Sequence, residues 1–261
     1  MFQKIFRALS KRLAAYLTKP LAHYHEFSLI NTQALKDTLQ PGDVLLVEGN
    51  SRISVAIKYL TQSTWSHACI YLGDDAEMPL VEADLQRGII RVPLSKYTQY
   101  NLRICRPVNL QLSDIQKLSH FILERLDDEY DLKNIFDLMR YLIPRPPVPH
   151  HYRRHMIALG SGDPTKAICS TLIAQAFQHI RYPILPRAVN ITSGNAHTAD
   201  DTRILESRHF SHFTPRDFDL SPYFTLVKPT IEGGFDYRKL NWLGDEENTC
   251  VAALASNKSL N

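Results

Sequence analysis

Hydrophobic residues recur along the first 20 positions at the spacing of an α-helix. Phe, Ile, Leu and Tyr side chains stand three or four residues apart, and the lysines and arginines fall largely on the other side. The pattern predicts a basic amphipathic helix within residues 1–30. Two roles need this pattern. The helix either docks its apolar side on the folded domain, or residues 1–20 bind to the surface of an anionic membrane. A basic segment poor in acids also suits an organellar transit peptide.

Short apolar runs bounded by turn residues fill the next part of the chain. "PGDVLLVEG" at 41–49 predicts a turn followed by a strand, and "SRISVAIKYLTQS" at 51–63 predicts a mostly buried helix that begins at a serine cap. Further strands are predicted at 67–73, 79–84, 88–94 and 101–108. We therefore expect a run of antiparallel strands behind one helix.

The second half of the chain has helical spacing in three places. Residues 112–128 keep apolar side chains on one face and open near Ser113, a candidate cap. Two more helices are predicted at 132–142 and 170–180, and a strand is predicted at 223–229. The prolines and basic residues of "IPRPPVPHHYRRH" predict an exposed loop between those two helices.

These elements predict an α+β fold, in which an antiparallel sheet packs against a layer of helices. The expected domain covers residues 31–243. It follows the amphipathic segment at 1–30 and precedes a flexible, weakly hydrophobic tail at 244–261.

The net charge and the cysteines indicate which binding partners and which cell compartment to expect. The net charge of the 261 residues is only +3, and no basic stripe with interleaved aromatics appears, so we expect no nucleic-acid partner. The four cysteines form no CxxC pair, which is typical of thiols in a reducing compartment. No apolar run reaches the roughly 18–20 residues of a membrane span, and no secretory signal is recognisable. The expected location is the cytoplasm, or the inner membrane face if the N-terminal helix binds lipid.

Cys169 stands at the beginning of the helix predicted at 170–180. A helix N-terminus favours the thiolate form of a cysteine, and its first backbone N–H groups can bind an oxyanion. Cys169 is therefore a candidate nucleophile. The alternative is a small, buried and inert thiol.

His67 and Glu82 are the candidate partners of this cysteine. His67 opens a predicted strand, and Glu82 lies among apolar residues of the next one. If the two strands pair, Glu82 stands opposite His67 or one step away, where its carboxylate can orient the imidazole of a general base. Alternatively, His67 is a hydrogen-bonded core residue and Glu82 faces solvent at an edge.

The order of these motifs resembles a known family of hydrolases. "PGDVLLVEG", "WSHACIYLG", "LVEAD", the pair "YD" at 130–131, "ICSTLIAQAF" and "TPRDFDLSPYFTLV" are similar to segments of the circularly permuted NlpC/P60 hydrolases of the YiiX/YebB-like type. The resemblance implies a papain-like fold in which the histidine precedes the cysteine. It implies Cys169 as the nucleophile, His67 as the base and Glu82 as the orienting residue. Tyr130, in the "YD" pair, would line the substrate site.

Two other clusters suggest metal chemistry only weakly. "HHYRRH" at 150–155 has two histidines at helical spacing, but it lacks the glutamate of a metalloprotease motif and follows several prolines. A solvated basic loop, or contact of its arginines with phosphate or lipid headgroups, are the other interpretations. The acidic residues at 127–131 lack the spacing of a calcium loop. We expect no metal and no other cofactor.

The sequence thus predicts a thiol-dependent amidase or peptidase acting on a small peptide or amide substrate. A membrane-associated acyl hydrolase or acyltransferase acting on lipid, similar to the lecithin retinol acyltransferase group, is the first alternative. A non-catalytic binding module is the second, because a fold can persist without its chemistry.

Overall fold

The computed structural model describes residues 12, 15–20, 32–85, 87–128, 169–189 and 204–239, and for a few of them, Cys169 included, it describes the backbone alone. None of the helices in these ranges is long and apolar enough to cross a bilayer. The elements in chain order are α2 (Thr32–Thr38), β1 (Val44–Val47), α3 (Arg52–Thr61), β2 (His67–Tyr71), β3 (Leu80–Asp84), β4 (Gly88–Val92), η1 (Leu94–Tyr97), β5 (Leu102–Pro107), α4 (Leu112–Leu123), α7 (Cys169–His179), β6 (Arg187–Val189), β7 (Ile204–Glu206), η2 (Phe210–His212), α8 (Pro215–Asp219), β8 (Phe224–Val227), α9 (Pro229–Glu232) and η3 (Tyr237–Lys239).

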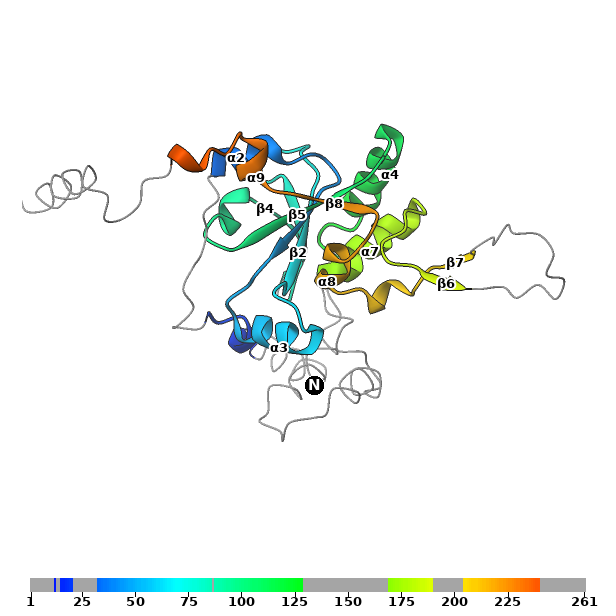
Figure 1. Ribbon diagram of the computed structural model, residues 1–261. Helices are drawn as coiled ribbons and strands as arrows, with labels where there is room; N and C mark the ends of the chain where they lie inside the picture. Colours follow the sequence, from blue (N-terminus) through cyan, green and yellow to red (C-terminus); the bar gives the residue numbers. More distant parts are fainter. Residues whose placement is uncertain are drawn as a thin grey trace, which may run out of the picture.

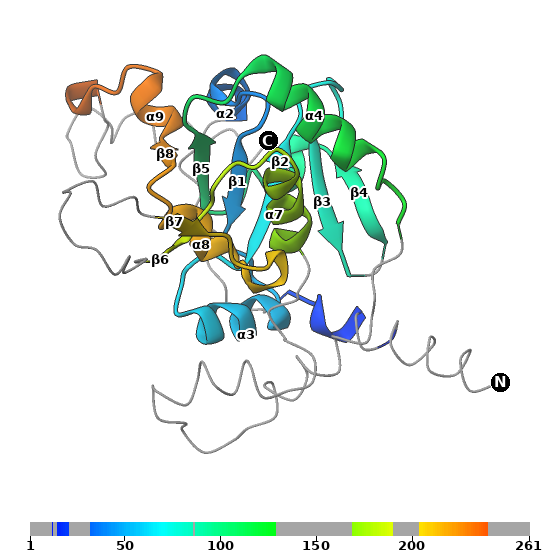
Figure 2. The same cartoon turned by 90° about the vertical axis from the view of Figure 1, so that its right-hand side faces the viewer.

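Six strands form one antiparallel sheet in the order β4-β3-β2-β1-β5-β8, and β6 pairs with β7 separately. In Figure 2 the sheet runs from β8 on the left to β4 on the right, with α7 in front of its centre. The five strands predicted between residues 41 and 108 and the late strand at 223–229 are all present. The predicted α+β fold with an antiparallel sheet and a helix layer is confirmed.

Both faces of the central strand β1 are buried, which explains its unbroken apolar run "VLLV". Val44 and Leu46 pack against α4, α7 and α8 in one hydrophobic cluster. Leu45 and Val47 pack on the other side, against residues of α2 and η1. Figure 1 shows the helices on the two sides of the strands. The sheet is therefore the middle layer of the domain, and successive strand residues enter different cores.

Helix α7 extends along the strands from one end of the sheet to the other, and its first residue lies toward the start of β2. Just after this helix, the Tyr182 hydroxyl donates to the backbone oxygen of Val108, which follows β5, at 3.0 Å. Strand β1 pairs with both β5 and β2. In this register the end of β5 next to Val108 and the start of β2 at His67 lie at opposite ends of the sheet. Eleven helical residues rise about 16 Å, close to the length of a strand. The backbone of Cys169 thus lies at the His67 end of the sheet.

Two local predictions about helices were wrong. Helix α3 begins after the predicted cap Ser51, whose hydroxyl accepts from the Ser54 N–H, but Val55 and Tyr59 are exposed, so the helix is only half buried. The buried residues of this helix are Ile53, Ser54 and Ala56. Helix α4 begins at Leu112, so Ser113 lies inside the first turn and Gln111 is the N-cap. The helix predicted at 132–142 and the tail at 244–261 lie outside the described residues.

The N-terminal segment is described only at residue 12 and residues 15–20. Residues 15–17 are helical, and the side chain of Leu17 is completely buried. Arg52 of α3 lies 4.3 Å from the ring centroid of Tyr16. For these residues the docked arrangement is the one present. Binding of residues 1–20 to a membrane stays a prediction.

A buried ion pair ties β5 to the turn before β1. Arg106 donates to both carboxylate oxygens of Asp43, at 2.9 and 2.7 Å, and to the backbone oxygen of Thr38 at 2.6 Å. Asp43 is 1% exposed. Burial raises the pKa of Asp43, and the hydrogen bonds from Arg106 and from the Gln40 N–H oppose that rise. Removing the arginine would leave a buried carboxylate without its counter-charge.

We therefore expect Arg106→Met to lower the free energy of unfolding by about 3 kcal/mol, measured by urea denaturation at pH 7. The control is Arg87→Met, because the Arg87 side chain is 60% exposed and lies 3.9 Å from Asp84. That control should change stability by less than about 0.5 kcal/mol. Equal losses in the two variants would contradict a structural role for the buried pair.

Candidate active site

The start of strand β2 is fixed by contacts on both sides of the chain. Trp65 is buried, and its indole N–H donates to an Asp219 oxygen at 3.1 Å. Arg103 donates to the other oxygen of Asp219 at 2.6 Å and stacks on the Trp65 ring. The Ser66 N–H donates to the backbone oxygen of Val47 at 3.1 Å. These contacts hold His67, the next residue, at a defined position.

Gly49 makes a close approach of two backbone segments possible beside His67. Its N–H donates to the Ser66 hydroxyl at 2.9 Å. A Cβ atom at this position would lie 2.3 Å from the Ser54 hydroxyl oxygen and 2.9 Å from that of Ser66. Only glycine fits there without displacing the serines.

Glu82 of β3 reaches the imidazole of His67 across the two paired strands. The register pairs Ile70 with Val81 and Tyr71 with Leu80, so its continuation pairs Cys69 with Glu82. Glu82 is therefore two steps from His67 on the same face, not opposite or one step away as predicted. His67 Nε2 still lies 3.1 Å from Glu82 Oε2. Glu82 is 1% exposed, so the alternative of a solvent-facing edge residue was wrong.

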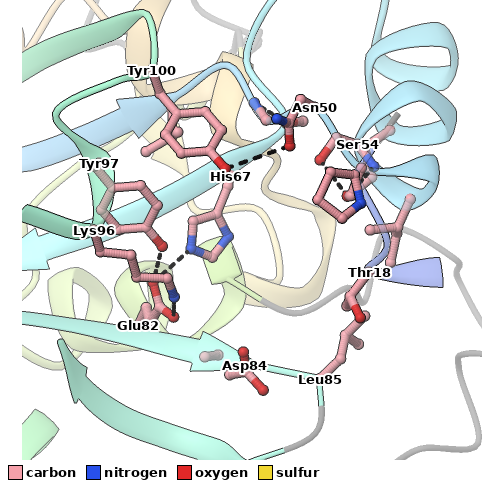
Figure 3. A pocket seen from close by; sticks show the side chains of 18 residues that line it. Thr18, Asn50, Ser54, His67, Glu82, Asp84, Leu85, Lys96, Tyr97 and Tyr100 are labelled. Carbon is pink, nitrogen blue, oxygen red and sulfur yellow. Dashed lines mark hydrogen bonds and ion pairs between the residues drawn. The ribbon is translucent and has the colours of Figure 1, made fainter. Parts of the chain in front are cut away.

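The Glu82 carboxylate accepts hydrogen bonds from several donors besides His67. Lys96 of η1 donates to Oε1, the Tyr97 hydroxyl donates to Oε2, and the Cys69 thiol lies 3.5 Å from Oε2. Figure 3 shows Lys96, Tyr97 and His67 converging on this carboxylate. Burial by itself raises the pKa of Glu82, but the hydrogen bond and charge of His67 and the charge of Lys96 hold it well below its usual range. Glu82 is therefore ionised at neutral pH.

An ionised Glu82 assigns the proton of the histidine. A carboxylate only accepts hydrogen bonds, so the Nε2 atom of neutral His67 carries the hydrogen that faces Glu82. Nδ1 is then the basic nitrogen of the ring. This is the tautomer that a general base needs when a carboxylate orients it from the other side.

Lys96 and Tyr97 were not recognised from the sequence. Both belong to η1, a short 3-10 helix that follows β4, and no motif marks them. The only available signal was a glutamate in an apolar strand, which needs more than one donor when it is buried.

Cys69 is a poor second nucleophile. It is completely buried, and this burial raises its pKa. Since the thiolate is the reactive form, a buried thiol with a raised pKa reacts slowly. Its thiol serves as one more donor to Glu82.

His67, Cys69 and Glu82 are also the metal-binding candidates among the described residues, because their ligand atoms lie within 4.8 Å of one another. A cation there would compete with the Lys96 ammonium group and would have to release the Cys69 proton. These charges favour a hydrogen-bonded network over a metal centre.

A cavity of about 260 Å³ opens beside His67 at the end of the sheet. Glu82 and Asp84 lie on one face of β3 and line the cavity together with their chain neighbours Ala83 and Leu85. Neutral polar residues form much of its wall. They are Thr18, Asn50, Ser51, Ser54, Ser66 and Tyr100.

Two predicted site residues are not placed by their side chains. Cys169 is the first residue of α7, but its side chain lies outside the described part of the chain. Tyr130 and the loop at 150–155 also lie outside it. Of the predicted triad, the described residues bring His67 and Glu82 together.

The depressed pKa of Glu82 predicts a pH-dependent contribution to stability. Because this pKa in the folded protein lies below its ordinary value of 4.5, the charged group stabilises the fold above that pH. This contribution is lost as the pH falls through the folded-state value. The stability advantage of the parent over Glu82→Gln should be largest at pH 7 and smaller at pH 3, in urea unfolding. Glu77→Gln, in an exposed turn, is the control, and an advantage that did not change with pH would contradict the assignment.

Comparison with known proteins agrees with these features. A sequence model of the family described as "Permuted papain-like amidase enzyme, YaeF/YiiX, C92 family" matches residues 38–141. The match includes His67 and Glu82 and ends before Cys169. It names the YaeF/YiiX family, which is close to the NlpC/P60 resemblance seen in the sequence but not the same family.

Two similar proteins come from Escherichia coli. The chain is 23% identical over 162 residues to the probable lipoprotein peptidase YaeF of strain K12, a match over 56% of this chain and 58% of YaeF. The crystal structure of the metalloprotein yiiX from strain O157:H7 aligns with a TM-score of 0.44 and 16% identity, over 72% of this chain and 96% of that one. The chain thus spans 58% of the length of its curated relative. By sequence, it is similar to the permuted papain-like amidases of the YaeF/YiiX type.

Proposed function

We propose that the protein is a thiol hydrolase of the amidase or peptidase class, with Cys169 as nucleophile, His67 as general base and Glu82 as the orienting carboxylate. The observation that carries this proposal is the imidazole of His67, held by a buried carboxylate at the wall of a cavity. The family description as an amidase and the description of YaeF as a probable peptidase support the same class.

The direction of α7 supports Cys169 as the nucleophile. The helix begins at the end of the sheet where β2 begins, but it packs on the face opposite to the one that carries His67 and Glu82. His67 is the first residue of its strand, and it lines the cavity there. A thiolate at the helix start and the imidazole would therefore meet around the end of β2. The N-terminus of α7 would favour the thiolate.

The reaction follows from these roles. His67 Nδ1 takes the proton of the Cys169 thiol, and the thiolate attacks the carbonyl carbon of the amide. The resulting oxyanion accepts hydrogen bonds from backbone N–H groups at the start of α7. The protonated imidazole gives its proton to the departing amine, which leaves a thioester on Cys169. Water then attacks the thioester, with His67 again as the base, and releases the acid and the thiol.

We place a peptide or amide before a lipid as substrate. A cavity of about 260 Å³ is smaller than the roughly 300–1,000 Å³ of pockets that enclose drug-sized ligands. A long acyl chain would need more room than the described cavity offers.

The first test is loss of activity in Cys169→Ser and His67→Ala. Each should lower kcat/KM for a cleaved amide on the order of 10³-fold or more, because members of a nucleophile–base pair act as a unit. Cys105→Ser, a change at a buried cysteine in the core, is the control and should keep most of the activity. Values of kcat/KM like those of the parent in the Cys169 and His67 variants would contradict the proposal.

A second test does not need a known substrate. Iodoacetamide should alkylate Cys169 selectively near pH 6, with the labelled residue identified by peptide mass, and His67→Ala should shift that reaction to higher pH. Cys69 and Cys105 should react slowly in the folded protein, because burial raises the pKa of both thiols. Equal and slow labelling of all the cysteines would argue for a non-catalytic module.

A further inference from the structure

Helix α8 lies close to both elements that carry the proposed catalytic pair. Helix α7 begins with Cys169, and strand β2 begins with His67. Figure 2 shows α8 beside the lower end of α7 and above α3, at the end of the sheet where β2 begins. The chain around α8 forms side-chain hydrogen bonds to the chain at both of these starts.

The first connection joins α8 to the start of α7. Ser170 follows Cys169 directly and is completely buried. Its hydroxyl donates to the backbone oxygen of Phe213 at 2.7 Å. Phe213 is buried too, and it precedes Thr214, the N-cap of α8. The backbone next to the proposed nucleophile is therefore joined to the beginning of α8.

The second connection joins the end of α8 to the start of β2. Asp219 is the last residue of α8, and one of its oxygens accepts from the Trp65 indole N–H at 3.1 Å. Its other oxygen accepts from Arg103 at 2.6 Å. Trp65 lies two residues before His67 in the chain. One carboxylate therefore joins α8 to the strand that carries the proposed base.

Helix α8 is itself anchored in the core and at its N-terminus. Phe218 is completely buried, and its ring centroid lies 6.3 Å from that of Phe177 in α7 and 5.6 Å from that of Phe224 in β8. The Asp217 carboxylate accepts from the Thr214 N–H at 2.7 Å and closes the first turn of the helix. A short helix held in this way keeps its two ends at a constant separation.

The two connections add a constraint that packing alone does not supply. Helix α7 packs on the sheet through apolar side chains, and apolar contacts are not directional. Hydrogen bonds, in contrast, fix both distance and angle. A nucleophile and its base need hydrogen-bond reach of each other, and a misplacement of about 1 Å can cost about 100-fold in rate.

We propose that Asp219 is a positioning residue for the Cys169–His67 pair, and that α8 sets the separation of thiol and imidazole by joining the start of β2 to the start of α7. The chemical roles of the pair rest on the proposed function. The connection between the two starts rests on the contacts of Ser170, Trp65 and Asp219.

The test uses the full chain with Asp219→Ala and Ser170→Ala, singly and together. The first readout is the rate at which iodoacetamide alkylates Cys169 at pH 6, divided by the rate at pH 9, with the labelled residue identified by peptide mass. At pH 9 a free thiol is largely ionised without help from an imidazole, so a change in access alters both rates and leaves their ratio unchanged. Each single variant should lower the ratio about tenfold, because the displaced imidazole no longer stabilises the thiolate.

The double variant distinguishes one shared device from two unrelated effects. Unrelated effects add in free energy, so two tenfold losses would multiply to about 100-fold. If both connections serve the same purpose, breaking the second one adds little once the first is broken. The ratio in the double variant should then lie within about threefold of the ratio in either single variant.

The second readout does not involve cysteine chemistry. It is the hydrogen exchange of the Trp65 indole N–H, followed by NMR on protein with ¹⁵N-labelled tryptophan and assigned with Trp65→Phe. Ser170→Ala does not remove either partner of the Trp65–Asp219 hydrogen bond. Exchange at Trp65 should nevertheless become about tenfold faster in this variant, because the start of α7 is connected to that bond through α8.

Ser221→Ala is the matched control. Ser221 is buried as well, and its hydroxyl donates to the backbone oxygen of Ile184, which lies beyond the last residue of α7. This variant loses the same kind of bond at the other end of the helix, so both readouts should stay at the parent values. Thermal unfolding identifies any variant that fails to fold. If Asp219→Ala does so, Trp65→Phe breaks the same connection, keeps an aromatic ring and should lower the alkylation ratio.

The outcomes separate the positioning role from the hydrolase. If His67→Ala lowers the alkylation ratio but folded Asp219→Ala and Ser170→Ala keep the parent ratio, the positioning role is overturned and the proposed function stands. Losses that multiply in the double variant would also contradict a single device. If His67→Ala leaves the ratio unchanged, the positioning role fails together with the proposed function, and faster exchange at Trp65 would support only the connection between the two starts.

Discussion

The buried carboxylate of Glu82 is the interaction on which the site depends. It joins three elements that are separate in the chain, because its hydrogen-bond donors come from β2 and from η1 while it belongs to β3. A charge at a side chain that is 1% exposed is tolerable only with such partners. The same donors that stabilise Glu82 also fix the ring of His67 and select its tautomer. The contacts that stabilise the buried charge of Glu82 are therefore the same contacts that orient His67 as the proposed base.

The two-sided sheet explains where a site can form. With a core on each face, the interior of the sheet has no room for a substrate, and the strand ends are the accessible positions. His67 stands at such an end, and α7 begins at the same end on the other face. The cavity borders His67 there. A nucleophile and a base carried on opposite faces would thus approach each other around the strand end.

The N-terminal segment connects an unexplained sequence pattern to this site. Its apolar side suits docking and membrane binding equally well when only the pattern is considered. The described part is docked, and it lines the cavity with Thr18 and Pro20. A piece of chain that precedes the domain in the sequence thus borders the same cavity as His67 and Glu82.

The sequence by itself determined the strands of the six-stranded sheet, the serine cap of α3, the helix with Cys169 at its start and the candidate pair of His67 and Glu82, but not the strands β6 and β7. Local periodicity, turn residues and a charged residue in an apolar run are local signals, and they carry that information. The tertiary structure alone decided that Lys96 and Tyr97 complete the shell of Glu82, because nothing local links η1 to β3. It also decided the diagonal register of His67 and Glu82, since the loop between their strands permits more than one pairing. Finally, the tertiary structure decided which face of the sheet α7 covers and where residues 15–20 dock. An apolar stripe predicts that one side of a helix is buried, but it does not identify the surface on which that side packs.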